Sequence, residues 1–143
     1  MHDIVHELTI AAPPDAVFDA VTTRDGLASW WTTDCQAEPA EGSEATFGFD
    51  GRSVVIRMRI DALEPPELVH WLCIDGPDEW VGTSVAFRIE PAHDTPGSSV
   101  VRLWHGGWEY EDGLLPRCSF QWAMYLESLR RYLETGTGSP NTD

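Results

Sequence analysis

The hydrophobic period of this chain changes once, from two residues to about 3.6, close to Gly113. Beyond that point apolar side chains recur every three or four residues, which is the spacing of one face of an amphipathic helix. At 1.5 Å per residue, a helix of about 20 residues is about 30 Å long and crosses a whole small domain. The stripe consists of Leu115, Cys118, Trp122, Leu126, Leu129 and Leu133, with Tyr125 and Tyr132 at its edge.

The residues before Gly113 alternate as half-buried β-strands do. The dipeptide Asp50-Gly51 separates two of these segments and favours the left-handed conformations of a tight hairpin turn. One segment, 68–74, is apolar on both faces. The predicted strands are residues 4–10, 45–49, 53–60, 68–74, 81–89 and 100–105.

Two short helices are predicted directly after the first strand. Pro13 and Pro14 end that strand and are compatible with the first turn of a helix that runs to about Thr22. Thr23 is then placed to cap a second helix. This second helix carries Leu27, Trp30 and Trp31 at helical spacing.

A sheet must bury one face, and only the last helix is long enough to cover it. The sequence therefore predicts a single α+β domain over residues 1–135, with a curved antiparallel sheet wrapped around the long C-terminal helix. Because a twisted sheet does not meet a straight helix everywhere, we expect a cavity between them. Residues 136–143 are polar and rich in glycine, and we expect them to form a disordered tail.

The charge of the chain narrows the possible partners. Its 24 acids and 9 bases give a net charge of −15, which repels nucleic acid and anionic membranes. Every base is arginine, and the absence of lysine excludes Schiff-base catalysis.

No apolar run approaches the roughly 20 residues of a membrane span, and the N-terminus lacks the features of a secretory signal. Three scattered cysteines are typical of reduced thiols, so we expect a cytoplasmic protein.

The common sequence motifs of metal, nucleotide and serine chemistry are missing. In a strand, His70 and Cys73 point to opposite faces, so this spacing does not clamp one ion. No G-x-S-x-G, phosphate-binding glycine loop or dinucleotide fingerprint occurs. We therefore expect neither a metal nor a cofactor.

Three segments resemble a known superfamily: ELTIAAPPDAVFDAVTTRDGLASWW, LEPPELVHWL and SSVVRLWHGGWE followed by an aromatic-rich helix. They resemble the SRPBCC or START-like proteins, and most closely the bacterial heat-shock ATPase activator (Aha)-like group. The resemblance covers roughly residues 3 to 135. It implies a helix-grip (START-like, Bet v-like) fold with a ligand between the sheet and the C-terminal helix. Trp30 and Trp31 match the paired tryptophans of the family, and His105 matches a histidine near the end of its last strand.

The surplus of aromatic residues has two interpretations, which the sequence leaves open. These side chains either line one cavity or fill a solid core. If they line a cavity, apolar walls with a few polar groups are the usual composition of a small-molecule site. The candidate ligand-binding residues are Trp31, Phe47, Phe49, Met58, His70, Thr83, Phe87, Leu103, His105, Trp108, Trp122, Tyr125 and Leu126.

His105 is the one candidate for catalysis, because a histidine with a pKa near 6.5 can donate and accept protons. A structural histidine bonded to neighbouring groups is the favoured alternative. The carboxylates Glu109, Glu111 and Asp112 follow Trp108 in a predicted loop, where solvated charge is the simpler interpretation.

The leading functional hypothesis is the binding of a small apolar or aromatic molecule between the sheet and the C-terminal helix. The first alternative is a polyketide cyclase-like or hydrolase-like enzyme that uses His105 with a nearby acid. The second is a co-chaperone-like interaction protein, whose acidic surface suits a basic partner. Homodimerisation is also plausible, because several tryptophans could be left near the surface.

Overall fold

The computed structural model describes residues 1–143, and its elements follow the order that the periodicity predicts. Seven strands form one antiparallel sheet with the order β1-β7-β6-β5-β4-β3-β2. The elements are β1 (His2–Ile10), α1 (Pro14–Ala20), α2 (Arg24–Trp30), β2 (Cys35–Gln36), β3 (Glu44–Phe49), β4 (Val54–Glu64), β5 (Leu68–Asp75), β6 (Ser84–Pro91), β7 (Ser99–Trp108) and α3 (Leu115–Thr135).

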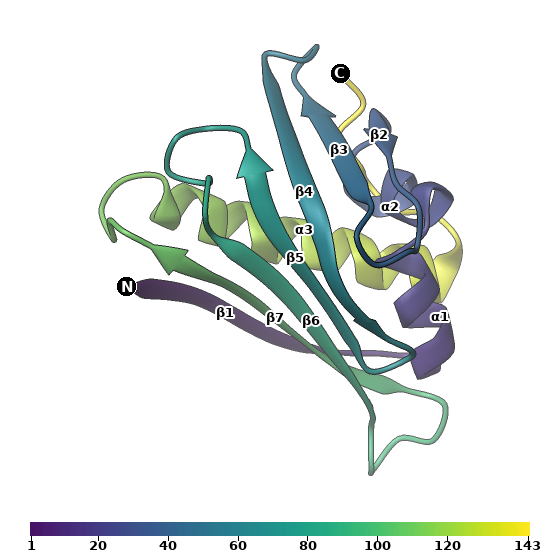
Figure 1. Cartoon of the computed structure of the whole chain (residues 1–143). Coiled ribbons are helices and arrows are strands. Elements are labelled where there is room, and N and C mark those ends of the chain that lie inside the picture. Colours follow the sequence, from purple (N-terminus) through teal and green to yellow (C-terminus); the bar gives the residue numbers. More distant parts are fainter.

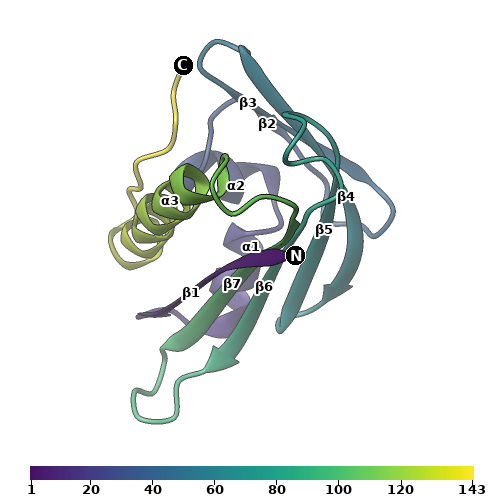
Figure 2. The same ribbon diagram turned by 90° about the vertical axis from the view of Figure 1, so that its left-hand side faces the viewer.

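The sheet bends around α3, which crosses its concave face (Figure 1). Seen along the helix, β1, β7 and β6 lie on one side of α3, and β3 and β4 on the other (Figure 2). The short helices α1 and α2 lie at the C-terminal end of α3 (Figure 1). The predicted α+β helix-grip fold is confirmed. No helix of the structure combines the length and the apolar composition that a membrane span requires.

The N-termini of α1 and α2 form as their local sequence predicts. Pro14 occupies the first turn of α1, where a missing N–H costs nothing. The Thr23 hydroxyl accepts a hydrogen bond from the backbone N–H of Gly26 at 3.0 Å, so Thr23 caps α2 as predicted. On β1, the inward side chain of His6 hydrogen-bonds Ser119 of α3, with Nε2 3.1 Å from the carbonyl oxygen.

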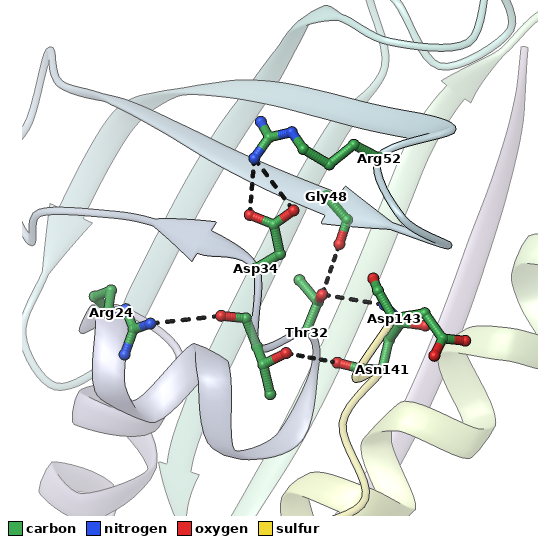
Figure 3. Close-up of polar contacts among 8 residues, drawn as sticks. Arg24, Thr32, Asp34, Gly48, Arg52, Asn141 and Asp143 are labelled. Carbon is green, nitrogen blue, oxygen red and sulfur yellow. Dashed lines mark hydrogen bonds and ion pairs between the residues drawn. The ribbon is translucent and has the colours of Figure 1, made fainter.

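The β3–β4 hairpin is longer than the predicted tight turn. Phe49 pairs with Val54, so four residues, 50–53, form the loop. Asp50, Gly51 and Arg52 all have positive φ angles, of 53°, 65° and 68°. The Arg52 guanidinium lies 2.9 Å from the Asp34 carboxylate and holds this loop against the segment that precedes β2 (Figure 3).

Strand β6 begins at Ser84, three residues later than predicted. Residues 77–83 instead form turns, in which the N–H groups of Trp80 and Val81 both donate to the Pro77 carbonyl. Val81 is exposed as a result, whereas Trp80 is buried.

A β-bulge in β7 changes the face on which Trp108 lies. Asp3 pairs with Gly106 and His2 with Trp108, so Gly107 is the extra residue. Its φ of 91° is accessible to glycine at little cost. Strict alternation would send Trp108 outward with Trp104. The bulge turns it inward, and it is fully buried.

The structure differs from the expected disordered tail, because residues 138–141 pack between α2 and α3. The Asn141 N–H donates to the Trp31 carbonyl at 2.8 Å, and the Thr33 N–H donates to the Asn141 carbonyl at 2.9 Å. The Ser139 N–H donates to the Ser128 hydroxyl at 2.7 Å. Figure 3 shows Asn141 beside Thr32, whose hydroxyl donates to the Gly48 carbonyl.

Gly138 of this tail is required by the close approach of its neighbours. A Cβ at Gly138 would collide with the Ser29 carbonyl and lie 3.1 Å from the Ser128 carbonyl and hydroxyl. Any residue other than glycine at position 138 would therefore displace the backbone of α2 or α3.

Gly138→Val should detach the tail while leaving the sheet intact. We expect the loss of the hydrogen bonds made by Asn141 and Ser139 to reduce the free energy of unfolding by about 1–3 kcal/mol. Amide hydrogen exchange at Thr33 measures detachment directly. Thr142→Val, at an exposed position of the same tail, is the control and should keep the protection. Unchanged exchange at Thr33 in Gly138→Val would contradict the docking.

Candidate ligand-binding pocket

Aromatic rings fill the centre of the space between the sheet and α3. Trp31, which follows α2, is the hub of this cluster and is 2% exposed. Its ring centroid lies 4.4 Å from that of Phe47 and 5.2 Å from that of Trp122. Phe49, Trp71 and Trp30 surround it at 5.6 Å, 6.0 Å and 6.0 Å. Most of the predicted hollow is therefore solid core.

A cavity of about 230 Å³ remains at one end of this cluster. It lies between the first half of α3, the β3–β4 hairpin and the loop before β6, and it is partly open to solvent. The lining residues are Trp31, Phe49, Asp50, Val54, Ile56, Pro77, Trp80, Leu114, Arg117, Cys118, Gln121, Trp122, Tyr125 and Asn141.

Helical spacing divides the part that α3 contributes into two rows. Cys118 and Trp122 are buried and form the floor beside Trp31. Arg117, Gln121 and Tyr125, each one turn apart, form a second row along the same wall. Arg117 and Gln121 are exposed and Tyr125 is half-buried, so this second row forms the rim of the pocket.

The predicted site residues separate into those at the pocket and those in the core. Trp31, Phe49, Trp122 and Tyr125 line the cavity. The solid-core interpretation holds for the other apolar candidates, each 3% exposed or less. These are Phe47, Met58, Phe87, Leu103, Trp108 and Leu126.

His105 and Thr83 form a closed chain of hydrogen bonds beneath the pocket. The Trp122 indole N–H donates to His105 Nδ1 at 3.0 Å. Since an indole nitrogen only donates, the neutral imidazole carries its proton on Nε2. Nε2 then donates to the Thr83 hydroxyl at 2.8 Å, and this hydroxyl donates to the Trp80 carbonyl at 2.6 Å. Neither ring nitrogen is left for a substrate.

The surroundings of His105 keep it neutral. Its side chain is 0% exposed and contacts the rings of Trp80 and Trp108, with centroids 4.5 Å and 4.6 Å away. This burial lowers the pKa of His105 to about 3. No acid contacts the ring, so the histidine–acid pair expected for an enzyme is not formed.

The prediction that His70 lines the pocket is corrected by the strand register. His70 pairs with Ala86 on β6 and Ala62 on β4, on the outer face of the sheet. Its neighbour Trp71 points inward, is 1% exposed and stacks on Trp31. Because β5 is apolar on both faces, alternation alone did not distinguish the two sides.

The loop acids after Trp108 stay solvated. Glu109, Glu111 and Asp112 are exposed, and the Glu111 carboxylate lies 3.6 Å from the His2 imidazole at the start of β1. None of the three lines the cavity.

Several lining residues were not predicted from the sequence, and only some of them had a sequence signal. Cys118 belongs to the predicted stripe of α3, and Val54 and Ile56 lie on the alternating strand β4. Pro77 and Trp80 lie before residue 81, where the predicted strand began, and nothing was predicted for them. Asn141 belongs to the tail, which composition alone assigned to disorder.

Cys118 is the one cysteine that lines the pocket. Burial raises the pKa of Cys118, so the thiol stays protonated near neutral pH. Burial also raises the pKa of Tyr125, and the nearby Asp50 carboxylate adds to this effect. Cys118 and Tyr125 are therefore neutral in the pocket, and neither is an activated nucleophile.

Comparison with known proteins identifies related folds. A family model described as Activator of Hsp90 ATPase homolog 1-like protein matches residues 11–134. The Aha1 dimer from Colwellia psychrerythraea is 32% identical, with a TM-score of 0.86 over 96% of this chain and 100% of that chain. A Mesorhizobium loti protein is 20% identical, with a TM-score of 0.80 over 93% and 97% of the two chains. A Staphylococcus saprophyticus protein is 17% identical, with a TM-score of 0.79 over 96% of each chain. None of the curated proteins matches the chain.

Neutral His105 should make stability depend on pH in a defined window. The pKa of His105 in the folded chain lies below its value near 6.5 in the unfolded chain. Between these two values the unfolded chain binds a proton that the folded chain does not. The resulting stability is complete above about pH 6.5 and is lost as the pH falls towards about 3. His105→Gln should flatten this slope by up to about 1.4 kcal/mol per pH unit in denaturant unfolding.

His93→Gln, in the exposed loop after β6, provides the control for this experiment and should keep the wild-type slope. An identical slope in His105→Gln and the wild type would show that His105 does not stay neutral on folding.

Proposed function

The chain belongs to the family of Activator of Hsp90 ATPase homolog 1-like proteins, and within it we propose that this protein binds a small apolar or aromatic molecule between the sheet and α3. The observation that carries the proposal is the cavity of about 230 Å³ beside Trp31 and Trp122. Nine of its fourteen lining residues are hydrophobic, and its polar groups lie at the rim. This composition is typical of small-molecule sites.

The volume of the cavity limits the size of the ligand. An apolar cavity of about 150 Å³ accommodates benzene, whereas sites for drug-sized ligands span roughly 300–1,000 Å³. The proposed ligand therefore has one or two rings rather than the bulk of a lipid.

Binding is favoured over catalysis by the state of the buried groups. A cyclase-like or hydrolase-like mechanism through His105 needs a free ring nitrogen, and both nitrogens are bonded to Trp122 and Thr83. Cys118 lacks thiolate character, because burial raises its pKa.

A second candidate function is supported by the similarity to Aha1, an activator of the Hsp90 ATPase by family description. On this hypothesis the chain binds an Hsp90-type chaperone and stimulates its ATP hydrolysis. The net charge of −15 would steer the chain towards a basic surface of such a partner.

Homodimerisation and a cytoplasmic location complete the proposal. The similarity to a dimeric Aha1 supports a dimer, and β1 lies at one edge of the sheet, where a second chain can approach. The cysteines Cys35, Cys73 and Cys118 are free and buried, which is compatible with a reducing compartment.

Filling the pocket should abolish ligand binding without unfolding the protein. Val54 lines the cavity and is only half-buried, so Val54→Trp can place its indole in the empty volume. Native mass spectrometry of protein purified from its own host should detect a bound small molecule in the wild type and none in this variant. Val5→Trp on the exposed face of β1 is the matched control. Binding that persists in Val54→Trp would refute the assigned pocket.

The second function predicts a direct effect on a chaperone. Adding the purified chain to the Hsp90 of its own host should raise the rate of ATP hydrolysis until the effect saturates. An inhibitor of the Hsp90 nucleotide site removes the chaperone's share of the signal and so identifies contaminating ATPases. An unchanged rate would exclude this function and leave the binding of a small molecule unaffected.

A further inference from the structure

The rim of the pocket carries polar groups that nothing in the protein satisfies. Every buried side-chain nitrogen and oxygen has a hydrogen-bond partner, so the interior offers no free polar group to a ligand. Arg117, Gln121 and Tyr125 differ, because no hydrogen bond or ion pair involves their side chains. All three line the cavity from one wall of α3. Polar recognition of a ligand therefore depends on this row and on Asp50, which lines the cavity from the β3–β4 hairpin.

Arg117 is unusual in a chain with such a surplus of acids. There are 24 acids for 9 arginines, and six of the arginines form ion pairs with carboxylates. Those six are Arg24, Arg52, Arg57, Arg59, Arg102 and Arg130. Arg117 forms none and is the only basic residue of the pocket. Its guanidinium is left free at the rim.

The charges at the rim give the pocket a direction. Arg117 and Tyr125 are eight residues apart on α3, which corresponds to about 12 Å along the helix axis. Asp50 lines the pocket and acts electrostatically on Tyr125, so the negative end of the pocket is the Tyr125 end. The positive end lies at Arg117, near the start of α3.

We propose that the ligand of this pocket is a small aromatic carboxylate, with its ring against Trp122 and its carboxylate bound by Arg117 and Gln121. The inference rests on the proposed binding function and specifies its ligand class. The planar guanidinium matches a carboxylate with two parallel hydrogen bonds, and the amide of Gln121 adds a third donor one turn away. A hydrogen-bond donor at the other end of the ligand would meet Asp50.

The net charge of −15 does not reverse this preference. At physiological ionic strength, exposed charges beyond roughly 8 Å are largely screened, so the group in direct contact decides. At the Arg117 end that group is a cation. A ligand with an amine in place of the carboxylate would face Arg117 with like charge.

Three probes of nearly equal shape test the proposal: 4-hydroxyphenylacetate, its neutral amide 4-hydroxyphenylacetamide, and tyramine. Binding to the full-length protein is followed by quenching of tryptophan fluorescence and by calorimetry, up to millimolar concentrations. We expect the carboxylate to bind roughly tenfold more tightly than the amide, since hydrogen bonds to charged groups are the stronger ones. Tyramine should bind more weakly than both.

Arg117→Gln should remove the advantage of the carboxylate over the amide, because the charge that distinguishes the two probes is lost. Arg88→Gln removes the same charge from an exposed position on β6 that also lacks an ion pair, and it should behave as the wild type. Equal affinities in the wild type, or a preference that survives Arg117→Gln, would overturn the inference while the binding function stands. No binding of any probe to the wild type would also overturn the inference, whereas the binding function is decided separately by native mass spectrometry.

Discussion

The indole of Trp31 is the element on which the rest of this structure depends. Its ring lies in the centre of the aromatic cluster, in contact with Phe47 of β3 and Trp122 of α3. One edge of the same residue lines the cavity, and its carbonyl oxygen accepts the hydrogen bond that docks Asn141. Core, pocket and C-terminal segment are therefore coupled through one residue, by its ring and its backbone carbonyl, and a change in its position would affect all three.

The aromatic cluster also explains why the cavity lies at one end of the fold. Edge-to-face contacts of Phe87 with Trp30, Trp71 and Trp122 close the middle of the space under the sheet. Aromatic rings bury a large apolar area per side chain, and here they fill most of the gap between the bent sheet and α3. The cavity of about 230 Å³ remains where the β3–β4 hairpin and the loop before β6 face the first half of α3. The abundance of tryptophan thus serves mainly the core, and secondarily the pocket.

The sequence predicted the elements well because each has a clear period or capping residue. The stripe of α3, the alternation of β1 and the cap at Thr23 are local signals, and the structure matches them. Three features depend on contacts between distant segments and were not predictable. The bulge at Gly107 turns Trp108 inward, the register of β5 places Trp71 rather than His70 at the core, and the close passage of Gly138 docks the tail. The pocket was predicted only in part: Phe49, Trp122 and Tyr125 were found, whereas Cys118, Val54 and Ile56 were missed although they lie on regular elements. The lining residues in turns and in the tail had no periodic signal.

His105 connects the closed interior to the open rim without taking part in chemistry itself. By accepting the indole N–H of Trp122, it fixes the orientation of the ring that forms the pocket floor. Protonation would destroy this acceptor, so the burial that keeps the imidazole neutral also keeps the floor in place. A fully satisfied buried network makes its side chains rigid and defines one arrangement. The shape of the ligand would then be selected by the rigid floor, and its charge by the unpaired groups of the rim. This division gives the histidine a positioning role that accounts for its place in the strand.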